Sequence, residues 1–111
     1  MDIKLQEKDG IATVSIEGEI DSKTAPEAQE KLLPFVENHS RIVMDMSGLT
    51  FLSSAGLRMM LLIYRHATAR GGKVALVGLS EQIKDTMSAT GFLAFFELCA
   101  SIEKAMEAVR S

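Results

Sequence analysis

The most informative segment of the chain reads DMSGLTFLSSAGL, residues 45–57. It continues the apolar run Ile42-Val43-Met44, which is typical of a strand that is covered on both faces. We interpret Ser47-Gly48-Leu49-Thr50 as a loop and Ser54 as the start of a long helix that extends to about Arg70. A buried strand that leads through a short loop into a helix indicates an α/β protein.

Upstream of this segment, residues 2–6 and 12–17 alternate between polar and apolar side chains, as half-buried strands do. Asp9-Gly10 between them is a turn signal, so we expect the two strands to form a hairpin. Thr24-Ala25-Pro26-Glu27 then has the form of a helix start, in which Thr24 would supply the cap. Pro34 is expected to distort the last turn of that helix.

Downstream, residues 74–77 form a second buried apolar run, and Ser80 can cap a short helix that extends through Met87. Residues 95–98 are compatible with a short edge strand. A final amphipathic helix is indicated by apolar residues at helical spacing, namely Ile102, Ala105, Met106 and Val109. The order is therefore β-β-α-β-α-β-α-(β)-α in one domain over residues 1–111. Such an order favours a mixed, largely parallel sheet that begins with an antiparallel hairpin.

Composition excludes several classes of function. Hydrophobic residues make up 47% of the 111 residues and charged residues 24%, which is the balance of a globular domain. The net charge of −3, without any run of Lys or Arg, argues against nucleic acid as a partner. The single cysteine, Cys99, rules out an internal disulfide and a multi-cysteine metal site. Without a secretory signal or an apolar run near the ~20 residues that cross a bilayer, we expect a cytoplasmic protein that does not insert into membranes.

Ser54 is the candidate functional residue, and two interpretations of it compete. Serine is a preferred N-cap, and most serines at helix starts do no more than cap. The start of a helix is also electropositive and has N–H groups without helical partners, so it tolerates a phosphate of roughly −1.5 to −2 charge.

The two sides of the helix that follows Ser54 differ less in polarity than expected. Five residues on one side suffice to cover a sheet: Leu57, Met60, Ile63, Tyr64 and Ala67. The other side carries Ser54, Arg58, Leu61, Leu62 and Arg65. Grouped apolar residues on an outer face indicate a contact surface. The alternative is that neighbouring helices cover part of this face, or that isolated surface leucines have no special role.

Several motifs together resemble the STAS domain, and in particular that of bacterial anti-sigma factor antagonists. The resemblance rests on Phe51-Leu52-Ser53-Ser54-Ala55-Gly56-Leu57, preceded by Met44-Asp45-Met46-Ser47. Gly18-Glu19-Ile20-Asp21, Gly71-Gly72-Lys73-Val74 and Thr90-Gly91-Phe92 support it in the expected order along almost the whole chain. The resemblance implies a STAS-like single domain with a four- to five-stranded mixed sheet that helices cover mainly on one side.

This resemblance also implies a function. Such antagonists bind a serine-kinase anti-sigma factor when unmodified and thereby free a sigma factor. The kinase phosphorylates the antagonist with ATP and releases it, and a metal-dependent serine phosphatase resets the cycle. Members of this class are not enzymes themselves, so we expect no cofactor and no bound metal, and a monomer or weak dimer.

The family pattern places the phosphoacceptor on Ser54. The preceding position is commonly Asp in the family and is Ser53 here, which makes Ser53 a second candidate acceptor. The following position, commonly Ser or Thr, is Ala55. Asp21 matches an acidic loop residue that lies near the acceptor in the family. The predicted partner-binding residues are Asp21, Ser53, Gly56, Arg58, Leu61, Leu62 and Arg65, of which the last four follow from helix geometry alone.

Two other functions compete with this one. STAS-like modules also serve as constitutive subunits of transporters or lipid-transport complexes, where phosphorylation is not needed. An enzyme that uses Ser54 as a nucleophile would need a general base, and His39 and His66 are the two imidazoles in the chain.

Overall fold

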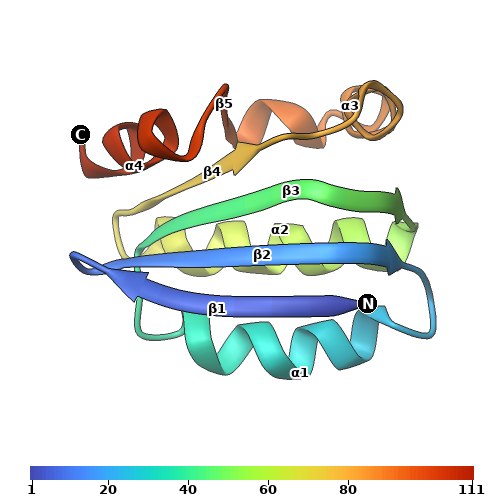
Figure 1. Cartoon of the computed structure of the whole chain (residues 1–111), viewed down its shortest axis with the longest axis horizontal. Coiled ribbons are helices and arrows are strands. Elements are labelled where there is room, and N and C mark those ends of the chain that lie inside the picture. Colours follow the sequence, from blue (N-terminus) through green and yellow to red (C-terminus); the bar gives the residue numbers. More distant parts are fainter.

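A five-stranded sheet with the strand order β1-β2-β3-β4-β5 forms the centre of the molecule in the computed structural model, which describes residues 1–111 (Figure 1). Its strands are β1 Asp2–Lys8, β2 Ile11–Ile20, β3 Arg41–Leu52, β4 Lys73–Val77 and β5 Glu97–Cys99. The β1–β2 pair is antiparallel, and every other pair is parallel. The predicted mixed sheet with an antiparallel hairpin at its start is therefore confirmed.

The hairpin follows directly from its turn residues. Lys8 pairs with Ile11, which leaves Asp9 and Gly10 as a two-residue turn with φ angles of 53° and 77°. Positive φ at both positions is the requirement of the turn type whose twist matches that of paired strands, and Asp-Gly meets it.

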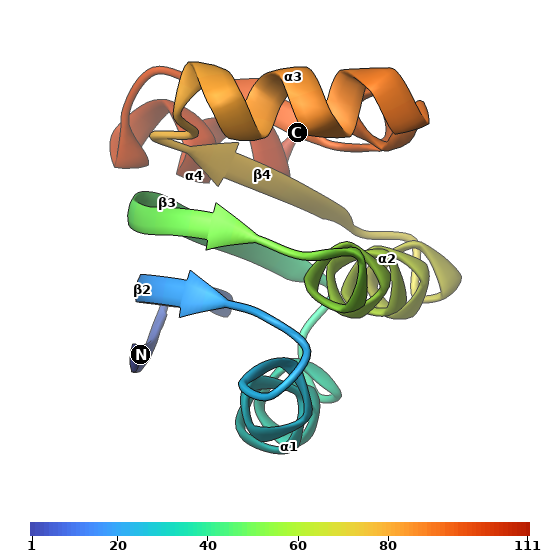
Figure 2. The same cartoon turned by 90° about the vertical axis from the view of Figure 1, so that its right-hand side faces the viewer.

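Helices cover the sheet unequally on its two faces. They are α1 Ala25–Val36, α2 Ser54–Ala69, α3 Glu81–Thr90 and α4 Ile102–Arg110, with a short 3₁₀ helix, η1, at Phe92–Phe95. Side chains of α1, α2 and α3 join a core cluster of 24 buried residues, whereas side chains of α4 join a cluster of six on the opposite face (Figure 2). The prediction of a sheet covered mainly on one side is confirmed.

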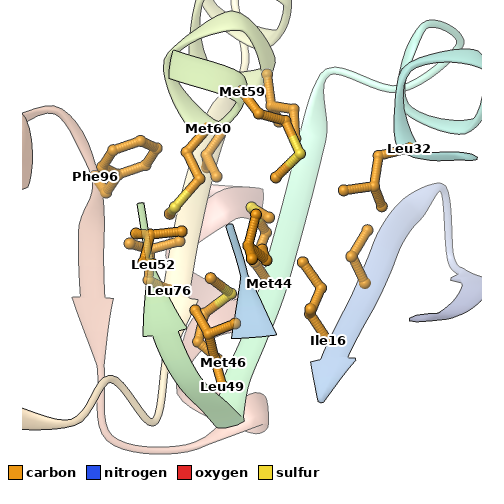
Figure 3. Packing of buried hydrophobic residues seen from close by; sticks show 14 of the residues in the cluster. Ile16, Leu32, Met44, Met46, Leu49, Leu52, Met59, Met60, Leu76 and Phe96 are labelled. Carbon is orange, nitrogen blue, oxygen red and sulfur yellow. The ribbon is translucent and has the colours of Figure 1, made fainter. Parts of the chain in front are cut away.

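The larger core is aliphatic and rich in methionine. Met59 and Met60 extend from α2 toward the sheet, where Met44, Met46 and Leu76 lie (Figure 3). No polar side chain is buried. A core of this kind is held by apolar burial and close packing rather than by internal hydrogen bonds.

Strand β3 is longer than the sequence suggested. Residues 47–50, which we expected to form a loop, belong to the strand, and Leu52 is its last residue. Glu17 to Ile20 of β2 pair with Gly48 to Leu52, so a neighbouring strand supplies the hydrogen bonds that keep this segment extended. The irregularity is local, because the Asp45 carboxylate accepts hydrogen bonds from the N–H (3.0 Å) and the hydroxyl (2.7 Å) of Ser47 where the register shifts.

The start of α1 also differs from the prediction. Thr24 occupies the N-cap position of α1, as expected, but its side chain makes no capping hydrogen bond; its hydroxyl oxygen accepts from the N–H of Asp21 at 2.8 Å and donates to the Glu19 carbonyl at 3.0 Å. The side chain therefore closes the loop before the helix instead of capping the helix. Pro34 lies within α1, which continues to Val36.

The C-terminal part of the chain follows the prediction with shifted boundaries. The Ser80 hydroxyl accepts from the N–H of Ile83 at 3.2 Å and caps α3, as expected. This helix continues past Met87 to Thr90, where Gly91 ends it in the left-handed conformation with φ of 81°. The edge strand at 95–98 starts later than expected, because Phe95 still belongs to η1 and β5 begins at Glu97. None of the helices combines the length and the apolar character that crossing a membrane would require.

Candidate functional site

Two serines at the start of α2 have different structural roles. Ser53 is the N-cap, and its hydroxyl accepts a hydrogen bond from the N–H of Gly56 at 3.2 Å. Ser54 is the first residue of the helix; its side chain is exposed and makes no hydrogen bond within the protein. The interpretation of Ser54 as the cap was therefore wrong by one residue. A side chain at the N-cap position can accept from the free N–H groups of the first turn, and Ser53 occupies that position.

The ends of β2 and β3 hold this turn in place. The N–H of Ser53 donates to the carbonyl of Ile20 at 2.8 Å. Gly56 is buried, and a Cβ atom there would lie 2.5 Å from Leu52 Cδ1 and 2.9 Å from Ile20 Cγ2. Gly56 thus lets the helix approach the strands closely, and it lies beneath the surface on which we expected it.

Asp21 borders the same site from the loop after β2. Its Oδ1 accepts the N–H groups of Lys23 and Thr24, each at 2.9 Å. These bonds, first that from Thr24 and then that from Lys23, lower the pKa of the Asp21 carboxyl below its usual value, because they stabilise the charged form. Since Ile20 bonds to Ser53, the Asp21 loop lies beside the start of α2 (Figure 1). The carboxylate organises this loop.

The two sides of α2 are divided as predicted. The four aliphatic residues expected to face the sheet are buried, and Tyr64 is half-buried. On the outer side, Arg58 and Arg65 are exposed, Leu61 is half-buried and Leu62 keeps 39% of its surface exposed.

A groove between α1 and α2 collects four of the five predicted outer residues, and Ser54 is not among the residues that line it. Its volume is about 900 Å³, and from α2 it is lined by Ala55, Arg58, Leu61, Leu62 and Arg65. The facing wall comes from α1. Helix α1 therefore forms the second side of a groove and leaves the outer face of α2 open. The other three predicted partner-binding residues, Asp21, Ser53 and Gly56, do not line this groove.

Phe51 is a further exposed residue that the sequence reasoning did not identify. It keeps 47% of its surface exposed and lies near the end of β3, three residues before Ser54. Because its surroundings were expected to form a loop, no strand pattern was applied to this segment. An exposed aromatic residue next to a candidate site favours contact with a partner.

Neither histidine is placed to act as a base for Ser54. His66 lies twelve residues further along the same helix, which is roughly 18 Å at 1.5 Å per residue. His39 follows the other end of α1 and bonds through its ring nitrogens to the Phe35 carbonyl (2.9 Å) and the Glu7 carboxylate (2.7 Å). The hypothesis of a serine nucleophile therefore lacks its imidazole base.

The mixed sheet, with an exposed serine at the start of its central helix, defines a small α/β domain. The STAS domain family model matches residues 2–105. The chain belongs to the STAS domain family.

Relatives within this family include anti-sigma factor antagonists. The chain is 29% identical to the anti-sigma-B factor antagonist of Bacillus subtilis over 103 residues, with 93% of each protein covered. It is 28% identical over 112 residues to BtrV of Bordetella bronchiseptica, with 100% of this chain and 97% of BtrV covered. The crystal structure of an anti-sigma factor antagonist from Mycobacterium paratuberculosis has a TM-score of 0.85 and 28% identity, covering 99% and 94% of the two chains.

More distant structures share the fold alone. SpoIIAA of Bacillus in its phosphorylated form has a TM-score of 0.76 at 20% identity, with 98% of this chain and 100% of that chain covered. A sulfate transporter family protein from Wolinella succinogenes has a TM-score of 0.77 at 17% identity, with 93% and 87% covered. Because one fold serves both kinds of protein, the function has to be argued from the residues around Ser54.

Proposed function

We propose that this protein is an anti-sigma factor antagonist whose partner binding is switched by phosphorylation of Ser54. It binds a serine-kinase anti-sigma factor while Ser54 is unmodified. The kinase transfers the γ-phosphoryl group of ATP to Ser54 Oγ, which gives phosphoserine and ADP and releases the antagonist. A metal-dependent serine phosphatase removes the phosphate by hydrolysis and restores the binding form.

The observation that carries this proposal is the free, exposed Ser54 hydroxyl next to an occupied one. The Ser53 hydroxyl is half-buried and accepts the N–H of Gly56, so its modification would remove a cap that contributes about 1 kcal/mol. Ser54 has no such bond to lose. This difference favours Ser54 as the acceptor over Ser53.

The position of Ser54 also supplies a physical reason for release. A phosphate there adds roughly −1.5 to −2 charge at the start of α2, where the helix dipole tolerates it. Arg58 lies four residues later, so it neighbours Ser54 on the helix surface. A phosphate that pairs with Arg58 withdraws this guanidinium from an acidic group of the partner. Phosphorylation then weakens binding without refolding the domain.

The test uses the purified protein, a serine-kinase anti-sigma factor from the same organism and ATP. We expect incorporation of one phosphate, which is lost in Ser54→Ala, and we expect Ser54→Asp to abolish binding to the kinase. Intact-mass spectrometry and a binding assay measure the two effects.

Ser53→Ala and Ser101→Ala are matched controls, because each removes a serine cap but leaves Ser54 in place. Both should still accept one phosphate. Labelling that persists unchanged in Ser54→Ala would contradict the proposal. Co-purification with a membrane permease, together with an absence of labelling, would instead indicate a constitutive subunit of a transporter or lipid-transport complex.

A further inference from the structure

The groove between α1 and α2 has an apolar floor. Leu33 of α1 faces Leu61 and Leu62 of α2 across it, and Ala25 and Ala55 lie near its start. Leu33 and Ala55 also pack against the main core, so the floor is continuous with a rigid part of the protein. An apolar floor of this kind favours binding of apolar side chains from a partner.

The two walls of the groove carry opposite charges. Glu30 and Glu37 belong to the α1 wall, and Arg58 and Arg65 belong to the α2 wall. All four side chains are exposed. An anion alone would be repelled by one wall and a cation alone by the other, so the walls together select an occupant that carries both signs on separate sides.

The two charges on each wall have the same spacing in the sequence. Glu30 and Glu37 are seven residues apart, as are Arg58 and Arg65. Seven residues are two helical turns, or roughly 10.5 Å along the axis. Both helices connect parallel strands, and both run from the end of one strand back to the start of the next (Figure 1). The two rows of charge therefore extend in the same direction along the groove.

None of these four charged side chains is paired within the protein. The ion pairs of the molecule join Lys31 to Glu27, His39 to Glu7, Lys84 to Glu81 and Arg110 to Asp9. The acidic and basic walls thus do not neutralise each other across the groove. Both rows remain available to a partner.

We propose that this groove binds an amphipathic helix of the regulatory partner, with acidic residues along one flank of its apolar face and basic residues along the other. The seven-residue spacing of the two charges on each wall matches the periodicity of helix packing, in which flanking charges select the partner. Only the identity of the partner rests on the proposed function. The groove, its charges and their helical spacing do not depend on Ser54 being phosphorylated.

The test uses three synthetic helical peptides with the same leucine face. One has Lys on one flank and Glu on the other, the second has Lys on both flanks, and the third has Glu on both. Each is held helical by a staple on its outer side and is verified as a monomer. We expect the mixed peptide to bind the full-length protein at least tenfold more tightly than either uniform peptide, as measured by fluorescence anisotropy.

Charge reversal of one wall should change this preference in a defined way. Arg58→Glu with Arg65→Glu makes both walls acidic, so the peptide with Lys on both flanks should bind most tightly. Glu30→Lys with Glu37→Lys makes both walls basic and should favour the peptide with Glu on both flanks. The matched control, Glu103→Lys with Glu107→Lys, changes two exposed charges on α4 across the sheet and should keep the wild-type preference.

Three results would overturn the proposal: equal binding of the three peptides, a preference that does not follow the wall charges, or a dimer in sedimentation that Arg58→Glu with Arg65→Glu dissociates. The last result would make a second copy the occupant. Circular dichroism verifies that each variant is folded.

The groove proposal and the proposed function can fail separately. If the peptide pattern fails while the kinase still phosphorylates Ser54, the groove proposal alone is wrong. If Ser54 is not phosphorylated while the pattern holds, the proposed function alone is wrong.

Discussion

Helices α2 and α4 lie on opposite faces of the same sheet and begin in the same way, but their outer sides differ. Each starts with a serine whose hydroxyl accepts the N–H three residues later at 3.2 Å, Ser53 in α2 and Ser101 in α4. The outer side of α4 is charged, and its exposed residues are Glu103, Lys104, Glu107 and Arg110. The outer side of α2 instead carries Leu61 and Leu62 between two arginines.

This comparison shows which features of α2 are specific to it. The serine cap is a local device that both helices use. After the cap, α4 continues with Ile102, which packs against the sheet, whereas α2 continues with a second serine that is exposed. A free hydroxyl followed by an apolar outer side is therefore the distinguishing feature of α2. Four variants or pairs of variants test this distinction.

The largest effect is expected at the third residue after the cap. Gly56→Val in α2 would place a branched side chain against Leu52 and Ile20 and should lower the free energy of unfolding by about 1–3 kcal/mol. The matched change in α4, Lys104→Val, is exposed and should cost about 0.5 kcal/mol or less. Urea denaturation measures both. Equal losses would show that α2 is not packed more closely at its start than α4.

The two serine caps should contribute equally to the free energy of unfolding. Ser53→Ala and Ser101→Ala each remove one hydrogen-bond acceptor, so each should lower the free energy of unfolding by about 1 kcal/mol. The same urea experiment compares them. A markedly larger loss in Ser53→Ala would mean that Ser53 has a structural role beyond capping.

The outer leucine should affect binding more than stability. Leu62→Gln should change the free energy of unfolding by no more than about 0.5 kcal/mol, because the side chain is exposed, but it should weaken binding of the mixed-charge peptide. Glu107→Gln on α4 should alter neither quantity. Denaturation and anisotropy on the two variants separate these effects. A loss of stability in Leu62→Gln comparable to that of a core substitution would assign Leu62 to the core.

The smallest effect concerns pH and the Asp21 loop beside α2. Because the pKa of Asp21 in the folded state is below the reference value of 3.8, its charge stabilises the fold fully above that value. This stabilisation is lost as pH falls through the lower pKa of the folded state. The difference in urea midpoint between wild type and Asp21→Asn should therefore be constant near neutral pH and shrink in acid. A difference that grows on acidification would contradict the assignment of a lowered pKa to Asp21 in the folded state.

Much of the fold could be predicted because the responsible interactions are local. The β1–β2 hairpin follows from Asp9-Gly10, which meets the backbone requirement of its turn. The cap of α3 by Ser80 and its end at Gly91 depend on neighbouring residues alone. Helical periodicity also divided α2 correctly into buried and exposed sides. In each case the residues that specify the structure lie close together in the sequence.

The parts that were mispredicted depend on neighbours distant in sequence. Residues 47–50 have a loop-like composition, but pairing with β2 keeps them in β3. Thr24 has the sequence context of a cap, yet it bonds to Asp21 and Glu19 in the preceding loop. The candidate site was likewise predicted only in part. The residue Ser54 was named from the motif, but its freedom from the capping bond became apparent only when Ser53 was located at the N-cap.

The sequence by itself determined the order of elements, the family to which the chain belongs and the serine pair at the centre of the proposed switch. These features reside in local pattern, since turn residues, caps and hydrophobic period act over a few positions. Tertiary structure alone decided how far β3 extends, that Gly56 lies beneath the surface and that α1 and α2 form a groove with oppositely charged walls. The physical reason is that each of these depends on the approach of segments roughly 30 residues apart, such as β2 to β3 and α1 to α2, and a local pattern does not encode their packing.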